Sequence, residues 1–167
     1  MRRTALLLSV ALLLAAGGTG LVRAHCEIPC GIYGDTTRID LLYEHMATVE
    51  KSMKQIVELS ADPAANANQL TRWIMNKEKH CDEIQHIVTQ YFMTQRLKPV
   101  DSGEEARKKY RNQIERLHRM LTRAMKAKQT TDPAHVAKMR ELLGLFSKRY
   151  FDEADLKHIQ KHHPEGK

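Results

Sequence analysis

Several residues that can bind a metal lie together just after a short apolar leader, between His25 and Cys30. Cys26 and Cys30 each offer a thiolate, and His25 offers an imidazole. If the leader is removed before His25, that residue gains a free amine, and the backbone amide of Cys26 becomes a further nitrogen donor. Because the amine exists only after cleavage, the chemistry of this segment depends on processing of the chain. We call residues 25–34 the hook.

The donor types in the hook favour nickel over other metals. An amine, a deprotonated amide and a thiolate in fused chelate rings require a planar arrangement, which suits Ni(II) and Cu(II) and not the tetrahedral Zn²⁺. Cu(II) tends to oxidise thiolates, so nickel is the better match. Thiolates also stabilise the higher oxidation state of nickel, which makes a redox role feasible with the His25 imidazole as a removable fifth ligand.

Two other interpretations of the hook use the same residues. A non-catalytic, exported nickel or copper carrier would bind metal there and exchange it. A purely structural protein would join Cys26 and Cys30 in a disulfide and bind no metal. The chain has three cysteines, and an odd number argues against a simple disulfide framework. The third, Cys81, lies in an amphipathic segment, where we expect a small buried core residue.

Residues 1–24 have the three parts of a secretory signal. Arg2 and Arg3 precede an apolar run, and Val22-Arg23-Ala24 suits a signal peptidase. The apolar run is shorter than the roughly 20 residues that span a bilayer, so we expect cleavage and no stable membrane anchor. The mature protein is then expected to be periplasmic or extracellular. The alternative is a cytoplasmic protein whose leader is removed by a dedicated peptidase.

Composition limits the classes of partner. The formal charge of the chain is +7, and removal of a leader with three arginines and no acid leaves +4. A mild positive charge can attract small anions by electrostatic steering. Basic residues are interleaved with acids and aromatic residues make up only 5%, so we expect no nucleic-acid partner.

Apolar residues recur at helical spacing after the hook, and no alternating strand pattern occurs. We expect helices at residues 36–60 and 66–97, from 102 onward and from 133 onward. Four amphipathic helices with short connections bury their apolar stripes well in an antiparallel four-helix bundle. The predicted fold is therefore an all-α, antiparallel four-helix bundle with an N-terminal metal-binding hook.

Local signals indicate where these helices begin and end. Ser102 to Glu105 has the pattern of a capping box, and Asp132-Pro133 has that of an N-cap followed by proline. The last helix is expected to break near Phe151-Asp152. The tail, which contains His158, His162 and His163, is expected to be frayed and solvated. The predicted domains are the leader at 1–24, the hook at 25–34 and the bundle at 35–167.

The segment HCEIPCGIY, from His25 to Tyr33, resembles the amino-terminal hook of nickel-containing superoxide dismutases, whose pattern is His-Cys-x-x-Pro-Cys-Gly-x-Tyr. A looser similarity continues along the helices that follow. The resemblance implies an enzyme that converts superoxide to dioxygen and hydrogen peroxide by Ni(II)/Ni(III) cycling. It also implies a four-helix bundle assembled as a homohexamer.

The resemblance assigns roles to particular residues. It implies that nickel is bound by the amine and imidazole of His25, the amide and thiolate of Cys26, and the thiolate of Cys30. Tyr33 would lie beside the open axial face, where its hydroxyl could order water or the incoming anion; packing of the hook against a helix would require the same placement.

Around the ligands, the resemblance points to three further residues. Asp40 falls where the family has a glutamate that hydrogen-bonds the hook imidazole. Glu44, one helical turn later, is a rival for that contact. His80 falls where an arginine holds the same network. Residues that orient a metal-bound imidazole tune the metal, so these positions would affect turnover.

Overall fold

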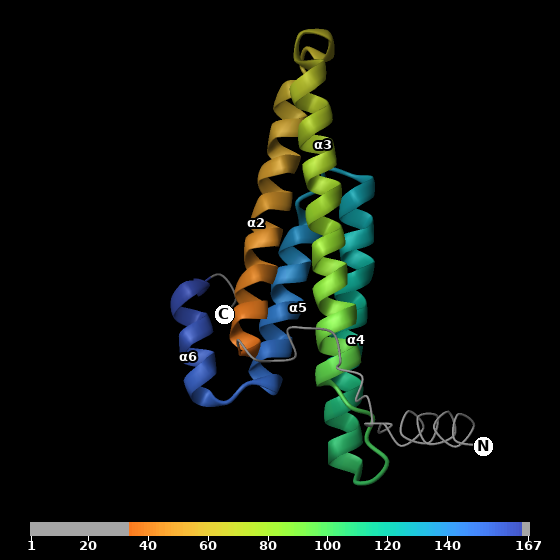
Figure 1. The fold of residues 1–167 in the computed structure, drawn as a ribbon, viewed down its shortest axis with the longest axis vertical. Helices are drawn as coiled ribbons and strands as arrows, with labels where there is room; N and C mark the ends of the chain where they lie inside the picture. The colour runs from red at the N-terminus through yellow and green to blue at the C-terminus, as the bar shows by residue number, and fades with distance from the viewer. Residues whose placement is uncertain (1–33, 165–167) are drawn as a thin grey trace, which may run out of the picture.

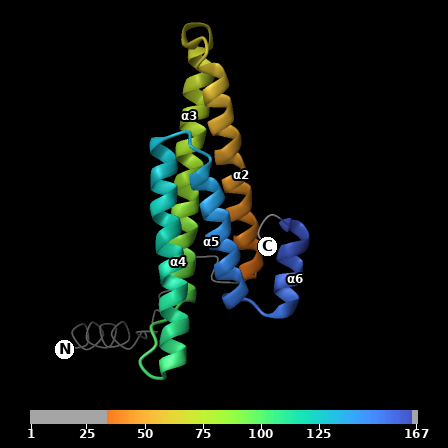
Figure 2. The ribbon, with the colours of Figure 1, turned by 180° about the vertical axis from the view of Figure 1, so that it is seen from behind.

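The computed structural model describes residues 34–164, and this part of the chain is entirely helical (Figure 1). The elements are α2 (Asp35–Leu59), α3 (Pro63–His86), the π-helical segment η1 (Ile87–Arg96), α4 (Glu104–Gln129), α5 (Ala134–Tyr150) and α6 (Glu153–His162). The four long helices α2, α3, α4 and α5 lie side by side, and α6 lies against α2 (Figures 1 and 2). The predicted all-α bundle is confirmed.

At the end where α2 turns into α3, the α2–α3 hairpin extends beyond the α4–α5 pair (Figure 2). The turn between its helices follows from two residues. The Asp62 side chain accepts a hydrogen bond from the Ala65 amide at 3.1 Å, and Pro63 occupies the first turn of α3, where its missing N–H costs nothing. The predicted helices at 36–60 and from 133 agree with α2 and α5 to within one residue.

The core lies where the apolar stripes of the four long helices face one another. Phe92 and Phe146 are fully buried, and their ring centroids lie 5.2 Å apart in an edge-to-face contact. Tyr150 stacks on Phe146 at 5.0 Å. Each fully buried large apolar side chain stabilises the fold by about 1.5–3 kcal/mol relative to its exposed state. Cys81 is fully buried, as the sequence predicts.

The predicted helix at 66–97 is present, but it begins three residues earlier, at Pro63, and it changes character before its end. At the end of η1, the amide of its C-cap Leu97 donates to the Phe92 carbonyl at 2.8 Å. This backbone bond joins residues five apart, which is the π-helical pattern. Such segments are rare and occur often at functional sites.

The predicted capping box at Ser102 is wrong. The structure has Gly103 as the N-cap of α4, with φ at 83°, and no side chain caps that end. A positive φ suits glycine, which carries no Cβ, and this conformation turns the chain directly into the helix. Ser102 therefore lies one residue outside the position from which a hydroxyl could cap.

The prediction of a frayed tail is also wrong. After the expected break, the Asp152 side chain caps α6 by accepting from the Asp155 amide at 3.0 Å. Ile159 of α6 is only 4% exposed. His163 stacks on Tyr43 with ring centroids 4.2 Å apart and contacts the Asp40 carboxylate at 2.8 Å. These contacts hold the tail against α2, so it is ordered and not frayed, while His158 and His162 stay exposed, as predicted.

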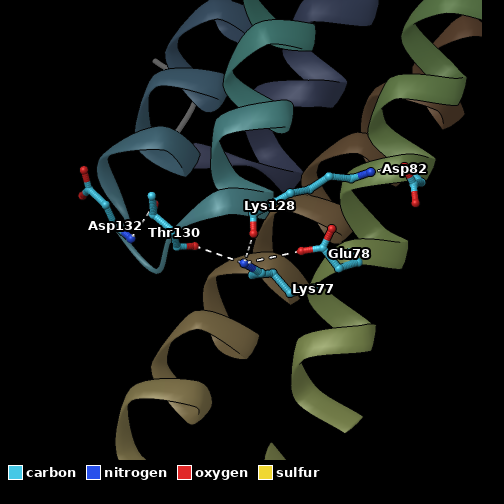
Figure 3. Close-up of polar contacts among 6 residues, drawn as sticks. All are labelled: Lys77, Glu78, Asp82, Lys128, Thr130 and Asp132. Atoms are coloured by element: carbon cyan, nitrogen blue, oxygen red, sulfur yellow. Dashed lines mark hydrogen bonds and ion pairs between the residues drawn. The ribbon is translucent and has the colours of Figure 1, made fainter. Parts of the chain in front are cut away.

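A buried lysine joins α3 to the end of α4 (Figure 3). Lys77 is 5% exposed, and its Nζ donates to the carbonyl oxygens of Lys128 and, at 3.2 Å, of Thr130. An ion pair to Glu78 at 3.6 Å partly balances its charge. A cation at the carbonyl end of a helix is favourable because it faces the negative end of the helix dipole. Lys77 thus performs the capping that no residue of α4 supplies.

Within residues 34–164, no helix is both long and apolar enough to cross a membrane.

Candidate functional site

The residues expected to bind the metal, His25, Cys26 and Cys30, lie outside the described residues, as does Tyr33. The structure does describe the point at which the hook joins the bundle, at Gly34 and Asp35. Gly34 has φ at 80° and ψ at 148°, a conformation that favours glycine because side chains with a Cβ rarely adopt it. This residue turns the chain into α2.

Asp35, the first residue of α2, accepts hydrogen bonds from three side chains of other elements. Its Oδ1 accepts from the Tyr91 hydroxyl at 2.5 Å. Its Oδ2 accepts from the Tyr150 hydroxyl at 2.5 Å and from the Arg96 guanidinium at 2.8 and 3.0 Å. We call these four residues the Asp35 cluster. It brings together the start of α2, both halves of η1 and the last residue of α5.

The electrostatics of the Asp35 cluster favour a charged aspartate between neutral tyrosines. Burial of the Asp35 carboxyl opposes ionisation, but the hydrogen bonds from Tyr150, Tyr91 and Arg96 outweigh it and hold the pKa of Asp35 below its ordinary value. Burial and the hydrogen bond to Asp35 raise the pKa of Tyr91 to about 12, and the same causes raise the pKa of Tyr150. The Asp35 side chain is 12% exposed.

An open cavity of about 460 Å³ adjoins the Asp35 cluster, where the hook joins α2. Its lining residues are Gly34, Asp35, Arg96, Tyr150, Phe151, Asp152 and Asp155.

The three residues expected near the nickel ligands lie on described helices, but no hydrogen bond or ion pair joins any two of them. Asp40 contacts His163 at 2.8 Å and His158 at 3.8 Å, both from the C-terminal segment. Glu44 is exposed and lines a separate cavity of about 210 Å³ between α2 and the C-terminal segment.

His80 of α3 pairs with His45 of α2, and their Nδ1 atoms lie 2.8 Å apart. Burial is the largest cause that lowers the pKa of each imidazole; the second ring adds to this for His45, and Lys79 adds to it for His80. At least one ring is therefore neutral when the hydrogen bond forms. His80 links the two long helices, and its expected role near the hook stays a prediction.

Sequence reasoning did not find the partners of Asp35 or of Asp40. Tyr91 and Tyr150 lie on apolar stripes, and a buried tyrosine hydroxyl needs a hydrogen-bond partner, so the sequence indicates that each has one. It does not indicate which one, because Tyr150 is 115 residues from Asp35. The sequence predicts a solvated tail at His163, and this prediction leaves no place for its contact with Asp40.

Metal-binding groups are scarce in the described bundle. Between residues 34 and 164, no group of three or more histidines, cysteines, aspartates or glutamates could hold a metal ion. Cys81 is unsuited to that role because burial raises the pKa of its thiol to about 11, which disfavours the thiolate that binds metals.

Comparison with known proteins covers the chain from residue 21 to the start of α6. Searches of curated proteins and of solved structures gave no match. The family model for nickel-containing superoxide dismutase matches residues 21–154, which include the entire hook and the four long helices. The chain therefore belongs to the nickel-containing superoxide dismutase family.

Proposed function

We propose that His25, Cys26 and Cys30 hold the nickel with which this enzyme disproportionates superoxide. Membership of the family makes the chain a nickel-dependent superoxide dismutase that converts two superoxide anions and two protons to dioxygen and hydrogen peroxide. The observation that supports these ligands is the nine-residue motif HCEIPCGIY, which lies inside the matched region. The family favours this function over that of a metal carrier.

The donor set fits nickel. Thiolates and nitrogen donors suit Ni(II), and a set that combines them within six residues places them close enough to bind one ion. The amine of His25, its imidazole, the amide of Cys26 and the thiolates of Cys26 and Cys30 would be the donors.

Nickel bound there would supply the one-electron redox chemistry of the reaction. The chain supplies the rest. The thiolates of Cys26 and Cys30 would lower the potential at which a bound nickel is oxidised, and the His25 imidazole would be a ligand that can be held or released. The hydroxyl of Tyr33 would order water or the incoming anion. A net positive charge would raise the rate at which superoxide arrives.

Processing of the leader creates the site in this account. Cleavage after Ala24 frees the His25 amine, leaves the hook at 25–34 and the bundle at 35–167, and removes the apolar run. If a signal peptidase cuts outside the cytoplasm, nickel is loaded there and the enzyme is periplasmic or extracellular. If a dedicated peptidase cuts inside, loading is cytoplasmic. Amino-terminal sequencing of protein from separated cell fractions distinguishes these routes.

A homohexamer is the proposed assembly, from the resemblance of the hook to the family. Large apolar side chains that remain exposed on the α2–α3 hairpin support an interface there. Val57 is 59% exposed, Ile74 42% and Met75 66%. Such residues are commonly covered by a partner when they lie close together.

The proposed ligands are tested by replacing them in protein that begins at His25. Cys26→Ser and Cys30→Ser should each abolish stoichiometric nickel binding and superoxide dismutation. The control is the double variant His158→Ala and His162→Ala, which removes exposed tail histidines that could bind nickel adventitiously. That control should keep both activity and nickel. Activity that survives in both cysteine variants would refute the assignment.

A further inference from the structure

We propose that the Asp35 cluster positions the hook, so that Asp35, Arg96 and Tyr150 control nickel affinity without touching the metal. This inference rests on the proposed ligands in the hook. It goes further by assigning a role to side chains that lie in the described bundle, outside the hook. Tyr91 is the fourth residue of the cluster and is left unchanged in the variants that test the inference.

The Asp35 side chain does not cap its own helix. Acidic residues at a helix start usually satisfy free amides of the first turn. The N-cap of α2 is Gly34, and no side chain caps that end. The Asp35 carboxylate instead accepts hydrogen bonds from Tyr91, Arg96 and Tyr150. The cluster therefore fixes where α2 begins relative to η1 and α5.

A short stretch of chain connects Asp35 to the proposed ligands. Four residues, 31–34, separate Cys30 from Asp35. A fully extended chain spans at most about 3.6 Å per residue, so the Cα atoms of Cys30 and Asp35 are at most roughly 18 Å apart. The point at which the chain is held therefore limits where the donors can lie, and Gly34 sets the direction in which it leaves α2.

The hydrogen bonds to the Asp35 carboxylate fix it firmly in place. A carboxylate that accepts charge-assisted hydrogen bonds from a guanidinium is bound about twice as strongly as a neutral pair. The two tyrosine hydroxyls restrict the same carboxylate from other sides, and the Asp35 side chain is largely shielded from solvent at 12% exposed. η1 carries both Tyr91 and Arg96. The π-helical segment therefore contributes to positioning the hook as well as to packing of the bundle.

The test compares Asp35→Asn, Arg96→Gln and Tyr150→Phe in protein that begins at His25. Tyr110→Phe is the matched control, because Tyr110 is a half-buried tyrosine of α4 outside the Asp35 cluster. Nickel affinity is measured on the apoprotein by competition with a chelator. The absorption of the nickel-loaded hook, kcat and KM are measured at saturating nickel, and Tm is measured on the apoprotein.

We expect nickel affinity to fall by about 10- to 100-fold in Asp35→Asn, and to fall less in Tyr150→Phe, with an altered thiolate-to-nickel absorption band in both. Arg96→Lys, which keeps the charge, should retain more affinity than Arg96→Gln. Tyr110→Phe should match the wild type. KM for superoxide should change less than kcat, because the cluster does not bind substrate.

Wild-type nickel affinity and absorption in all three cluster variants, accompanied by a lower Tm, would overturn the inference, because a merely structural role predicts that result. If Asp35→Asn fails to fold, Tyr150→Phe carries the same comparison, since it removes one hydroxyl and leaves the ring on Phe146. A wild-type protein that binds no nickel would instead refute the proposed function.

Discussion

The Asp35 carboxylate accepts hydrogen bonds from side chains 56, 61 and 115 residues away in the sequence. Such contacts form only after the bundle has assembled, so the unfolded chain has nothing equivalent. The pKa of Asp35 is therefore lowered, and that of Tyr91 raised, only in the folded state. Differences of this kind between the two states make stability depend on pH.

The shifted pKa values of Asp35 and Tyr91 should make the free energy of unfolding depend on pH in both the acidic and the alkaline range. A lowered carboxyl pKa stabilises the fold above pH about 4, and this contribution is lost as the pH falls through the folded-state value. A raised tyrosine pKa stabilises the fold below pH about 10, and this contribution is lost as the pH rises toward 12. Asp35→Asn should therefore lose less of its free energy of unfolding than the wild type at either extreme.

Urea unfolding of the apoprotein at several pH values measures that dependence. The control is Glu104→Gln, which removes an exposed carboxylate paired with Arg111 at 2.9 Å. The control should follow the wild type, because an exposed pair contributes little. Identical curves for Asp35→Asn and the wild type would show that the cluster does not couple ionisation to folding.

At the scale of helices, the sequence predicts most of what the structure contains. The bounds of α2 and α5 follow from apolar spacing and from Asp62, Pro63 and Pro133, because these signals are local. The predicted start of α4, at Ser102, is two residues early. The Ser-x-x-Glu pattern at 102–105 favours Ser102 as the cap, and a sequence does not reveal that Gly103 adopts a positive φ. The π-helical bonding of η1 and the docking of α6 depend on distant contacts, which periodicity does not report.

Lys77 joins α3 to the end of α4, and its replacement should lower the free energy of unfolding. Lys77→Met keeps the apolar stem but leaves the carbonyl oxygens of Lys128 and Thr130 without their donor. We expect a loss of about 1–3 kcal/mol in the free energy of unfolding, the usual cost of an unpaired buried polar group. Chemical denaturation measures it. Lys126→Met, at an exposed position of α4, is the control, and equal stability of the two variants would contradict the role of Lys77.

Docking of α6 on α2 gives a second prediction at this scale. His163→Ala removes both the stack on Tyr43 and the hydrogen bond to Asp40. Residues 153–162 should then exchange their amide hydrogens faster, while the amides of α4 and α5 stay as protected as before. His158→Ala serves as the control, since its distance to Asp40 is longer, at 3.8 Å. Unchanged exchange in α6 after His163→Ala would mean that other contacts hold this helix.

In the whole molecule, the proposed metal ligands and the helical bundle occupy different segments of the chain. The donors that we assign lie in the hook, just before α2 in the sequence, and the four long helices form the scaffold that follows it. The sequence predicts these ligands because they lie within six residues, and no long-range contact is needed to recognise them. Their surroundings could not be predicted, because residues as distant as Arg96 and Tyr150 converge on the attachment point.

The exposed apolar residues of the α2–α3 hairpin make the proposed homohexamer testable. Ile74→Glu with Met75→Glu places two charges on the surface that we expect a partner to cover. The assembly should become smaller in light scattering after size exclusion, while the helical circular dichroism is kept. Leu145→Glu on α5 is the control at an exposed apolar position away from the hairpin. A double variant of unchanged mass would exclude this surface from the interface.

We propose above all that the amine freed at His25 is part of the nickel site. The most direct measurement compares protein that begins at His25 with protein that carries one additional residue before it, and records nickel per subunit together with the rate of superoxide dismutation. We predict one nickel per subunit and fast turnover for the first protein, and loss of turnover for the second. Equal turnover in both proteins would contradict the claim, because the extended chain has no amine at His25.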